Sequence, residues 1–316
     1  MLNLQADGQI QPREGKALNY RIIGFSFPAA KGSTGYKLEI AEGNCQSEQA
    51  FSSGIINTIA SSTNKIVAEV PYFGSQYTWR VVYNGTAKKK SPLHHFSTMA
   101  NEELDSTKIR LRILTPASKY KDGYVFMDSY KALFDMKGKP VWFLPMKPGE
   151  TSLPRDIKAT PFGTITYMMM MDVYEINYDG DTLWKSPVSY QPFDDARITF
   201  HHQLSRLKNG NYMVLGNEFV LQKKNTGDDT LLNLEPLRQN NPDQSDTTYR
   251  KLVFGTVIEY DKNGKIVWQW KSSSYFNNSD IGARKLPDGT VNANVHENAF
   301  YFDEEKKNLY VSFKAI

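Results

Sequence analysis

The alternation of apolar and polar positions predicts short β-strands along almost the whole chain. No long stretch shows the 3.6-residue apolar period of a helix. No apolar run reaches the roughly 18 residues that a membrane-spanning helix needs. Aromatic residues make up 13% of the chain, with many Tyr and Phe, and these residue types favour strands. We therefore expect an all-β fold.

The first part of the chain predicts a β-sandwich. Turn signals such as Asn84-Gly85 separate short runs with strand character. The candidate strands are residues 18–27, 35–41, 65–70, 77–83 and 94–98. Residues 77–81 alternate aromatic with polar side chains, as a half-buried strand does. The segment resembles a fibronectin type III-like sandwich of about 90 residues. A polar, acidic linker follows at 99–107, so the predicted domains are 1–107 and 108–316.

The second domain repeats one hairpin. Each copy has an apolar run, an Asp or Asn, a Gly three residues later and a Trp four residues after the Gly. The copies cover residues 133–142, 175–184 and 259–268. Their glycines, Gly138, Gly180 and Gly264, are 42 and 84 residues apart. A period in this range with four short strands per unit is typical of a β-propeller.

The hairpins divide the second domain into three complete units and a fourth that begins. The first strands of the pairs are 123–127, 163–168, 210–215 and 308–313. We interpret the 84-residue gap as one unit with an insertion, because 221–250 is polar and lacks a second hairpin. This insertion could cover the channel, pair two subunits in a homodimer or be disordered. The chain stops inside the fourth unit, whereas propellers have about four to eight blades. We therefore expect a fragment of a longer protein, with a four-bladed ring as the alternative.

Charge and cysteine content narrow the partners. The net charge is +4 with mixed signs, and the short basic run 88–90 has the context of an exposed hairpin tip, so a nucleic-acid partner is not predicted. The single Cys45 excludes an internal disulfide and a Cys-rich metal site. The first residues lack a charged and then apolar leader. Either the protein is cytoplasmic or its targeting segment is absent from this chain.

Two His-x-amide motifs precede second strands of the repeat. One contains His201, His202 and Gln203, and the other contains His296 and Asn298. Residues two apart share one face of a strand, so both His side chains would point into a central channel if these strands are innermost. Each His alone also fits a packed structural role. A metal site is not predicted, because no HExxH and no matching acidic residues accompany the motifs. The run 168–171 of four Met is interpreted as packing.

These motifs resemble the bacterial aryl-sulfate sulfotransferases. The family pattern is roughly His-His-Asp, Leu-Pro-Asn-Gly-Asn, His-x-Asn-Ser and Ser-x-Arg, and here it corresponds to residues 200–203, 207–211, 296–299 and 309–314, together with the hairpin at 261–270. The resemblance covers about residues 108–316. It implies a six-bladed propeller with a small N-terminal β-domain that works in the periplasm or elsewhere outside the cytoplasm. The implied reaction moves a sulfuryl group from a phenolic sulfate ester to a phenol through a sulfated His, without a nucleotide donor or other cofactor.

The resemblance also assigns roles to residues. Those implied as catalytic are His201, His296 and Lys314, and those implied as substrate-binding are Asn298, His202 and Gln203. His201 and His296 match the two non-nucleophilic active-site His of the family, and Lys314 stands where the family has an Arg. The nucleophilic His would lie beyond Ile316, so we expect the fragment to be inactive.

Three departures from the family pattern leave alternatives open. Lys314 lacks the planar fork with which an Arg grips two oxygens, Gln203 replaces an Asp, and Ala299 replaces a Ser. They favour a non-catalytic propeller that binds a ligand or partner. A metal-dependent propeller lyase or lactonase is the other alternative. In the sulfotransferase hypothesis, His201 and His296 stabilise the sulfuryl oxygens and shuttle the phenol proton, and Lys314 adds positive charge.

Overall fold

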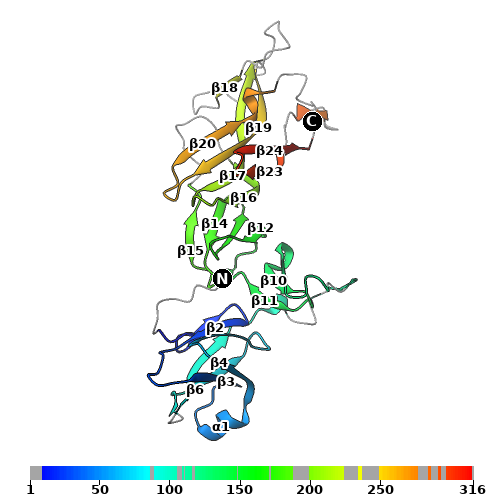
Figure 1. Ribbon diagram of the computed structural model, residues 1–316. Coiled ribbons are helices and arrows are strands. Elements are labelled where there is room, and N and C mark those ends of the chain that lie inside the picture. The colour runs from blue at the N-terminus through cyan, green and yellow to red at the C-terminus, as the bar shows by residue number, and fades with distance from the viewer. Residues whose placement is uncertain are drawn as a thin grey trace. The chain divides into compact units, whose positions relative to one another are not determined.

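The computed structural model confirms the all-β fold class, with a sandwich followed by small propeller-like sheets, none of which closes on itself (Figure 1). It describes residues 9–85, 89–104, 109, 111–115, 118–147, 149–170, 172–187, 199–223, 234–236, 249–276, 284–285, 291–292 and 297–314. They fall into two compact units, one drawn from Met1–Glu150 and Tyr178–Asp181, the other from Thr151–Asn177 and Thr182–Ile316. The predicted ring of six blades stays a prediction.

The first compact unit contains β1 (Lys16–Leu18), β2 (Ile22–Ser26), β3 (Gly35–Glu42), α1 (Glu48–Ser53), β4 (Ile55–Ser61), β5 (Lys65–Glu69), β6 (Gln76–Asn84), β7 (Lys89–Lys90), β8 (His94–Thr98), η1 (Glu102–Leu104), β9 (Tyr124–Met127), η2 (Asp128–Tyr130), β10 (Ala132–Asp135) and β11 (Pro140–Phe143). The second contains β12 (Pro154–Ala159), β13 (Ile165–Met169), β14 (Asp172–Ile176), β15 (Thr182–Lys185), β16 (Thr199–Arg206), β17 (Tyr212–Lys223), β18 (Leu234–Pro236), β19 (Tyr249–Tyr260), β20 (Ile266–Lys271), η3 (Ser272–Ser274), β21 (Arg284–Lys285), β22 (Val291–Asn292), β23 (Glu297–Asp303) and β24 (Asn308–Phe313).

The sandwich packs a sheet of order β1-β8-β6-β3-β4, with β7 beside β6, against the pair β2-β5. Apolar side chains from both sheets meet between them. Phe25 on β2 lies edge to face with Trp79 on β6, with ring centroids 5.1 Å apart. Large aromatic rings in this arrangement bury much apolar surface, so this contact forms the centre of the sandwich core.

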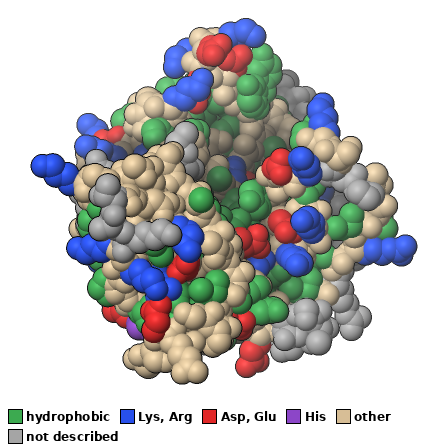
Figure 2. Space-filling model, turned by 60° about the horizontal axis from the view of Figure 1, so that its bottom comes forward, with side chains coloured by type: hydrophobic (Ala, Val, Ile, Leu, Met, Phe, Trp, Pro, Cys, Tyr) green, Lys and Arg blue, Asp and Glu red, His purple; other side chains and the backbone are tan. Residues whose placement is uncertain are grey.

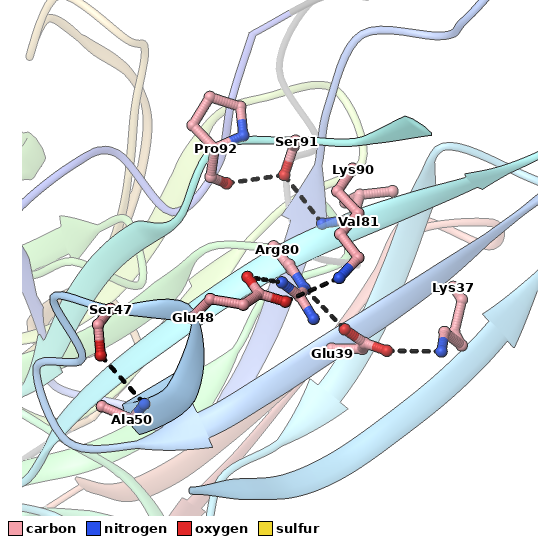
Figure 3. Close-up of polar contacts among 10 residues, drawn as sticks. All are labelled: Lys37, Glu39, Ser47, Glu48, Ala50, Arg80, Val81, Lys90, Ser91 and Pro92. Atoms are coloured by element: carbon pink, nitrogen blue, oxygen red, sulfur yellow. Dashed lines mark hydrogen bonds and ion pairs between the residues drawn. The ribbon is translucent and has the colours of Figure 1, made fainter. Parts of the chain in front are cut away.

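The opposite face of β6 is also buried, although alternation predicted it to be solvated. Arg80 is 4% exposed. It donates to Glu39 at 2.7 Å and to Glu48 at 2.5 Å, and Lys90 donates to the second oxygen of Glu48 at 2.7 Å (Figure 3). These hydrogen bonds lower the pKa of Glu48 to about 2. A buried guanidinium needs such partners, and the short helix α1, absent from the sequence prediction, supplies one.

The first repeat sheet has the order β11-β10-β9, which is three strands in the described residues. Backbone hydrogen bonds join β11 to the sandwich: Arg21 N donates to Val141 O at 2.9 Å and Phe143 N to Asn19 O at 3.0 Å. The Asn19 amide also donates to Phe143 O at 2.7 Å. These bonds explain why this sheet groups with the first compact unit. The domain boundary at 107/108 stays a prediction, since both residues lie outside the described ranges.

Three further repeat sheets make up most of the second compact unit (Figure 1). The second has the order β12-β13-β14-β15, the third β16-β17-β19-β20 with β18 beside β17, and the fourth consists of β23-β24. Trp184 of the second stacks on Tyr212 of the third with ring centroids 3.7 Å apart. Leu215 and Val257 of the third pack with Phe300 of the fourth. Apolar contacts therefore connect the second repeat sheet to the third and the third to the fourth.

The 84-residue gap between hairpins holds one sheet. β17 and β19 pair without interruption from Tyr212 opposite Tyr260 to Lys223 opposite Tyr249. Residues 221–223 and 249–250, which the sequence analysis assigned to the insertion, therefore belong to these two strands. Of residues 221–250, the structure describes 221–223, 234–236 and 249–250.

Local chemistry explains the repeated hairpin. The Asp261 carboxylate accepts hydrogen bonds from Asn263 N at 2.8 Å and Lys265 N at 2.9 Å, and Asp135 makes the same pair of bonds in the first hairpin. The backbone bonds lower the pKa of Asp261. Each of the three hairpins also has a register shift at the Asp or Asn side. An Asx turn followed by a glycine thus fixes the turn of the first and third hairpins.

The glycine of each hairpin is required by its backbone conformation, and the glycines of the second and third hairpins are also required for space. Gly138, Gly180 and Gly264 have φ of 79°, 90° and 79°, in the left-handed region that disfavours side chains. A Cβ on Gly264 would lie 2.8 Å from Pro187 Cγ, and a Cβ on Gly180 would lie 2.2 Å from Pro145 Cγ. Close packing against a proline therefore adds to the backbone requirement.

Among the helices in the described ranges, none is both long and apolar enough to cross a membrane. Figure 2 shows Lys and Arg side chains interspersed with Asp and Glu over the described part of the face in view. This interspersed pattern agrees with the mixed charge of the sequence.

Gly264→Ala is expected to lower the free energy of unfolding of the second compact unit by about 2–4 kcal/mol, from left-handed strain and the clash with Pro187. Gly210→Ala is the matched control, because Gly210 has φ 89° but its nearest neighbours are guanidinium nitrogens of Arg206 at 3.6 and 4.0 Å. It should lose only about 1–2 kcal/mol. Denaturant unfolding of both variants measures the difference, and equal losses would show that the proline contact is unimportant.

Candidate functional site

A β-bulge interrupts the first strand of the third repeat sheet. Phe200 pairs with Gly216 and Leu204 pairs with Val214, so three residues of β16 stand opposite Leu215 alone. The three residues are His201, His202 and Gln203. Bulges redirect side chains and are common beside active sites. The first His motif therefore lies in the irregular part of its strand.

The neighbouring sheets have bulges at the corresponding place. The bulge of β12 holds Asp156 and Ile157, and the extra residue in β23 is Asn298. A bulge breaks the alternation of faces along a strand. The expectation that His and amide share one face of a regular strand therefore does not apply to His201 and Gln203.

The backbone of these bulges has an uncommon conformation. His202 has φ 63° and Asp156 has φ 54°, both in the left-handed region. The rings of His201 and His202 are perpendicular, with centroids 4.9 Å apart. Both side chains are half-buried. Backbone conformations of this kind persist where the surrounding structure fixes them, often at functional sites.

Side chains in two bulges bond the next sheet, and we call this contact the inter-sheet staple. Gln203 Nε2 donates to Phe300 O at 2.8 Å, and Phe300 N donates to Gln203 Oε1 at 2.9 Å. Leu204 N donates to Asp156 Oδ2 at 2.8 Å. Asp156 and Gln203 each stand seven residues before the turn glycine of their sheet. Sequence reasoning missed Asp156, although this spacing was available. The Gln203 amide is thus bonded to the backbone of Phe300, and its substrate-binding role stays a prediction.

A buried acid, which sequence reasoning also missed, lies at the start of the fourth repeat sheet. Glu297 is 0% exposed. Its Oε1 accepts hydrogen bonds from Gly255 N at 2.7 Å and from the Ser272 hydroxyl at 2.9 Å. Burial raises the pKa of the Glu297 carboxyl above its usual range. The only sequence signal was its position between the His and the amide of the second motif.

The second motif is partly described. His296 lies outside the described residues. Asn298 and Lys314 are exposed. Phe313 pairs with Glu297, so the register brings Lys314 to the same end of the β23–β24 hairpin as Asn298. The catalytic roles of His201, His296 and Lys314, and the binding roles of Asn298 and His202, stay predictions.

The His pair of the sandwich has structural partners. His95 Nδ1 lies 2.9 Å from a Glu14 carboxylate oxygen, and its Nε2 lies 3.1 Å from Cys45 O. The His94 ring packs on Trp79 with centroids 4.9 Å apart. Burial lowers the pKa of His94. Within the part of the chain that the structure describes, no three His, Cys, Asp or Glu side chains gather as metal ligands would.

Gln203→Ala is expected to lower the free energy of unfolding of the second compact unit by about 1–3 kcal/mol, because the N–H and C=O of Phe300 lose their partner. Gln269→Ala is a suitable control, since it removes one 3.1 Å hydrogen bond to Thr256 within a single sheet. Its loss should be about 1 kcal/mol or less. Urea unfolding followed by fluorescence compares them, and an unchanged Gln203→Ala variant would contradict the staple.

The pH dependence of stability tests the burial of Glu297. Its folded pKa is raised, so its contribution is fully present below about pH 4.5 and is lost as pH rises through the folded pKa. Relative to Glu297→Gln, the wild-type melting temperature should therefore fall as pH increases from 4.5 and then level off. The residues beside the three partners of Glu297 do not supply a free buried charge. Phe254 and Thr256, which flank Gly255, are uncharged. Lys271, which precedes Ser272, is paired with Glu218 at 2.7 Å, and Lys314, which follows Phe313, is exposed. A difference that rises with pH would refute the shift.

Comparisons with known proteins do not identify a family. No family model matches the chain, and no curated protein matches it. One similar solved structure is a protein of unknown function from Bacteroides caccae, 12% identical, covering 57% of this chain and 60% of its own, with a TM-score of 0.29. Another is the rhamnogalacturonan lyase YesW, 14% identical, covering 85% of this chain and 44% of its own, with a TM-score of 0.27. The chain thus spans less than two thirds of either structure, and TM-scores this low support no functional assignment.

Proposed function

We propose that this protein transfers a sulfuryl group from a phenolic sulfate ester to a phenolic acceptor, in the manner of the aryl-sulfate sulfotransferases. The observation that carries the proposal is the pair of hydrogen bonds between Gln203 and Phe300, at 2.8 and 2.9 Å. They join β16, which bears the first His motif, to β23, which bears Asn298 of the second. Motifs almost a hundred residues apart in the chain thus belong to adjoining strands.

The residue types suit the chemistry. The reaction breaks the S–O bond of the donor ester as an S–N bond to a His nucleophile forms. It then breaks this S–N bond as an S–O bond to the acceptor forms, which frees the His. The departing phenolate takes up a proton and the acceptor phenol gives one up. His201 and His296 donate hydrogen bonds to the sulfuryl oxygens and move these protons, while Lys314 supplies positive charge. In the family that the motifs resemble, the nucleophilic His lies downstream of the second motif.

The proposal extends to the cellular setting. The enzyme works outside the cytoplasm, in the periplasm or a similar compartment, needs no cofactor and takes small phenolic molecules as donor and acceptor. These statements rest on the same resemblance as the reaction.

A non-catalytic propeller that binds a ligand or partner is the second candidate. Two observations favour it: the Gln203 amide is bonded to Phe300, and Lys314 is an exposed ammonium without the fork that grips two sulfate oxygens. Such a protein would bind an aryl sulfate without turning it over. Binding and turnover therefore separate the two candidates.

The complete natural protein, given p-nitrophenyl sulfate and a phenol, is expected to release nitrophenol at a rate that depends on the acceptor and survives chelator. His201→Ala and His296→Ala should each lower kcat about 10²- to 10³-fold. His95→Gln is the control, since His95 lies in the sandwich and bonds Glu14, and its kcat should be unchanged.

The alternative outcomes are distinct. Release that persists in the double variant His201→Ala/His296→Ala would refute the assignment of these residues. Binding of the ester without release would support the non-catalytic propeller. Loss of activity with chelator and recovery with added metal would support the lyase or lactonase alternative.

A further inference from the structure

Glu297 occupies a position that the preceding repeat sheets give to an apolar residue. Three residues occupy the same place in their sheets: Pro154 pairs with Met169, Phe200 with Gly216 and Glu297 with Phe313. Each of these partners stands four positions after the first apolar residue of its strand, so Pro154, Phe200 and Glu297 share one row. All three are buried, Phe200 at 3% and Glu297 at 0% exposure. A core needs only an apolar side chain in this row. A carboxyl group there opposes stability unless it is hydrogen-bonded, so another requirement keeps it.

The neighbouring strand is adapted to this carboxyl group. A Cβ on Gly255 would lie 1.5 Å from Glu297 Cδ and within 2.1 Å of both carboxyl oxygens. The φ of Gly255 is not in the left-handed region, so its backbone would accept any residue. Gly255 is therefore needed for space alone. Its missing side chain forms a seat on β19 that fits the Glu297 carboxyl.

The seat also fixes the orientation of the carboxyl group. Oε1 accepts from Gly255 N at 2.7 Å and from the Ser272 hydroxyl at 2.9 Å. Oε2 is buried and has no hydrogen-bond partner among the described residues. The backbone of Glu297 continues directly into the bulge residue Asn298. A residue held by β19 and η3 therefore stands immediately before this bulge.

We propose that Glu297 is a positioning residue, which anchors the Asn298 bulge to β19 and η3 so that the second motif meets the first. The inference rests on the proposed function, because the two motifs that Glu297 would bring together are those proposed to bind the sulfuryl ester. Gln203 on β16 forms hydrogen bonds with Phe300 on β23, and Glu297 on β23 accepts a hydrogen bond from Gly255 on β19. Strand β23 is thus bonded to two different strands. Two anchors on different strands restrict both sliding and rotation of β23, which one anchor does not.

A double-mutant cycle tests the seat without any assumption about activity. Gly255→Ala should strongly destabilise the second compact unit in the wild-type background, since the new methyl would overlap the carboxyl. In the Glu297→Ala background the same change should cost little or even stabilise, because the space is vacant and alanine suits a strand better than glycine. Additive effects in denaturant unfolding would overturn the seat.

Activity of the complete protein on p-nitrophenyl sulfate tests the positioning. Glu297→Gln keeps the shape and the Oε1 acceptor, so kcat should stay within about fivefold of wild type. Glu297→Met fills the row with an apolar chain, and this burial should offset much of the loss of the acceptor for Gly255 N and the Ser272 hydroxyl, so that the variant stays folded at the assay temperature. Its kcat should nevertheless fall about 10²-fold, as expected for a misplaced site, with KM changed much less.

The outcomes separate this inference from the proposed function. Wild-type kcat in Glu297→Met would overturn the positioning role, and so would a Glu297→Gln variant as inactive as Glu297→Met. A wild-type protein that binds but does not turn over the ester would sink the proposed reaction. In that case the affinity of the same variants for p-nitrophenyl sulfate replaces kcat, and an unchanged affinity in Glu297→Met would overturn the positioning.

Discussion

A backbone N–H group that leaves its own ladder must find an acceptor elsewhere, and the second compact unit depends on this constraint. Such a group follows the bulge in β16 and the bulge in β23. Leu204 N bonds Asp156 of the preceding sheet, and Phe300 N bonds Gln203. The bulge therefore has two effects. It places polar side chains such as His201 and Gln203 in the first strand, and it directs a backbone N–H toward the preceding sheet. The acceptor side chain stands in the bulge of the preceding sheet, so site residues and sheet contacts share one short segment.

The sequence predicted what is decided locally. An Asp or Asn followed by a glycine fixes a turn through bonds spanning a few residues, and the hairpins around Gly138, Gly180 and Gly264 formed as expected. The all-β class followed for the same reason. Helix α1 was missed because six residues carry no periodicity, although Ser47 caps its first turn by accepting from Ala50 N at 3.2 Å and Gly54 ends it. The burial of Arg80 depends on that helix, so it was missed too.

The sequence predicted a set of candidate site residues, whose roles stay predictions, but it did not predict the geometry of the strands that carry them. The two motifs were found, and the strands that carry them are joined. The bulges were not foreseen, because an extra residue in one strand is defined only by its partner strand. Counting along the sequence aligned His296 with His201. The register instead puts Glu297 in the row of Phe200, so that Asn298 stands level with the bulge that begins at His201. Glu297 was missed for this reason.

Gln203, which stands where the resembling family has an Asp, forms two hydrogen bonds with the next sheet. In the resembling family this position holds an Asp, and here Asp156 occupies the corresponding place one sheet earlier, where it accepts from Leu204 N. An amide can do what a carboxylate cannot, because it donates as well as accepts, and Gln203 does both with Phe300. Apolar packing holds the sheets together but is not directional, so it would tolerate a slip of β23 along its neighbour. A paired donor and acceptor do not tolerate it. Gln203 therefore helps to define the register between β16 and β23, the junction at which the proposed function requires the two motifs to meet.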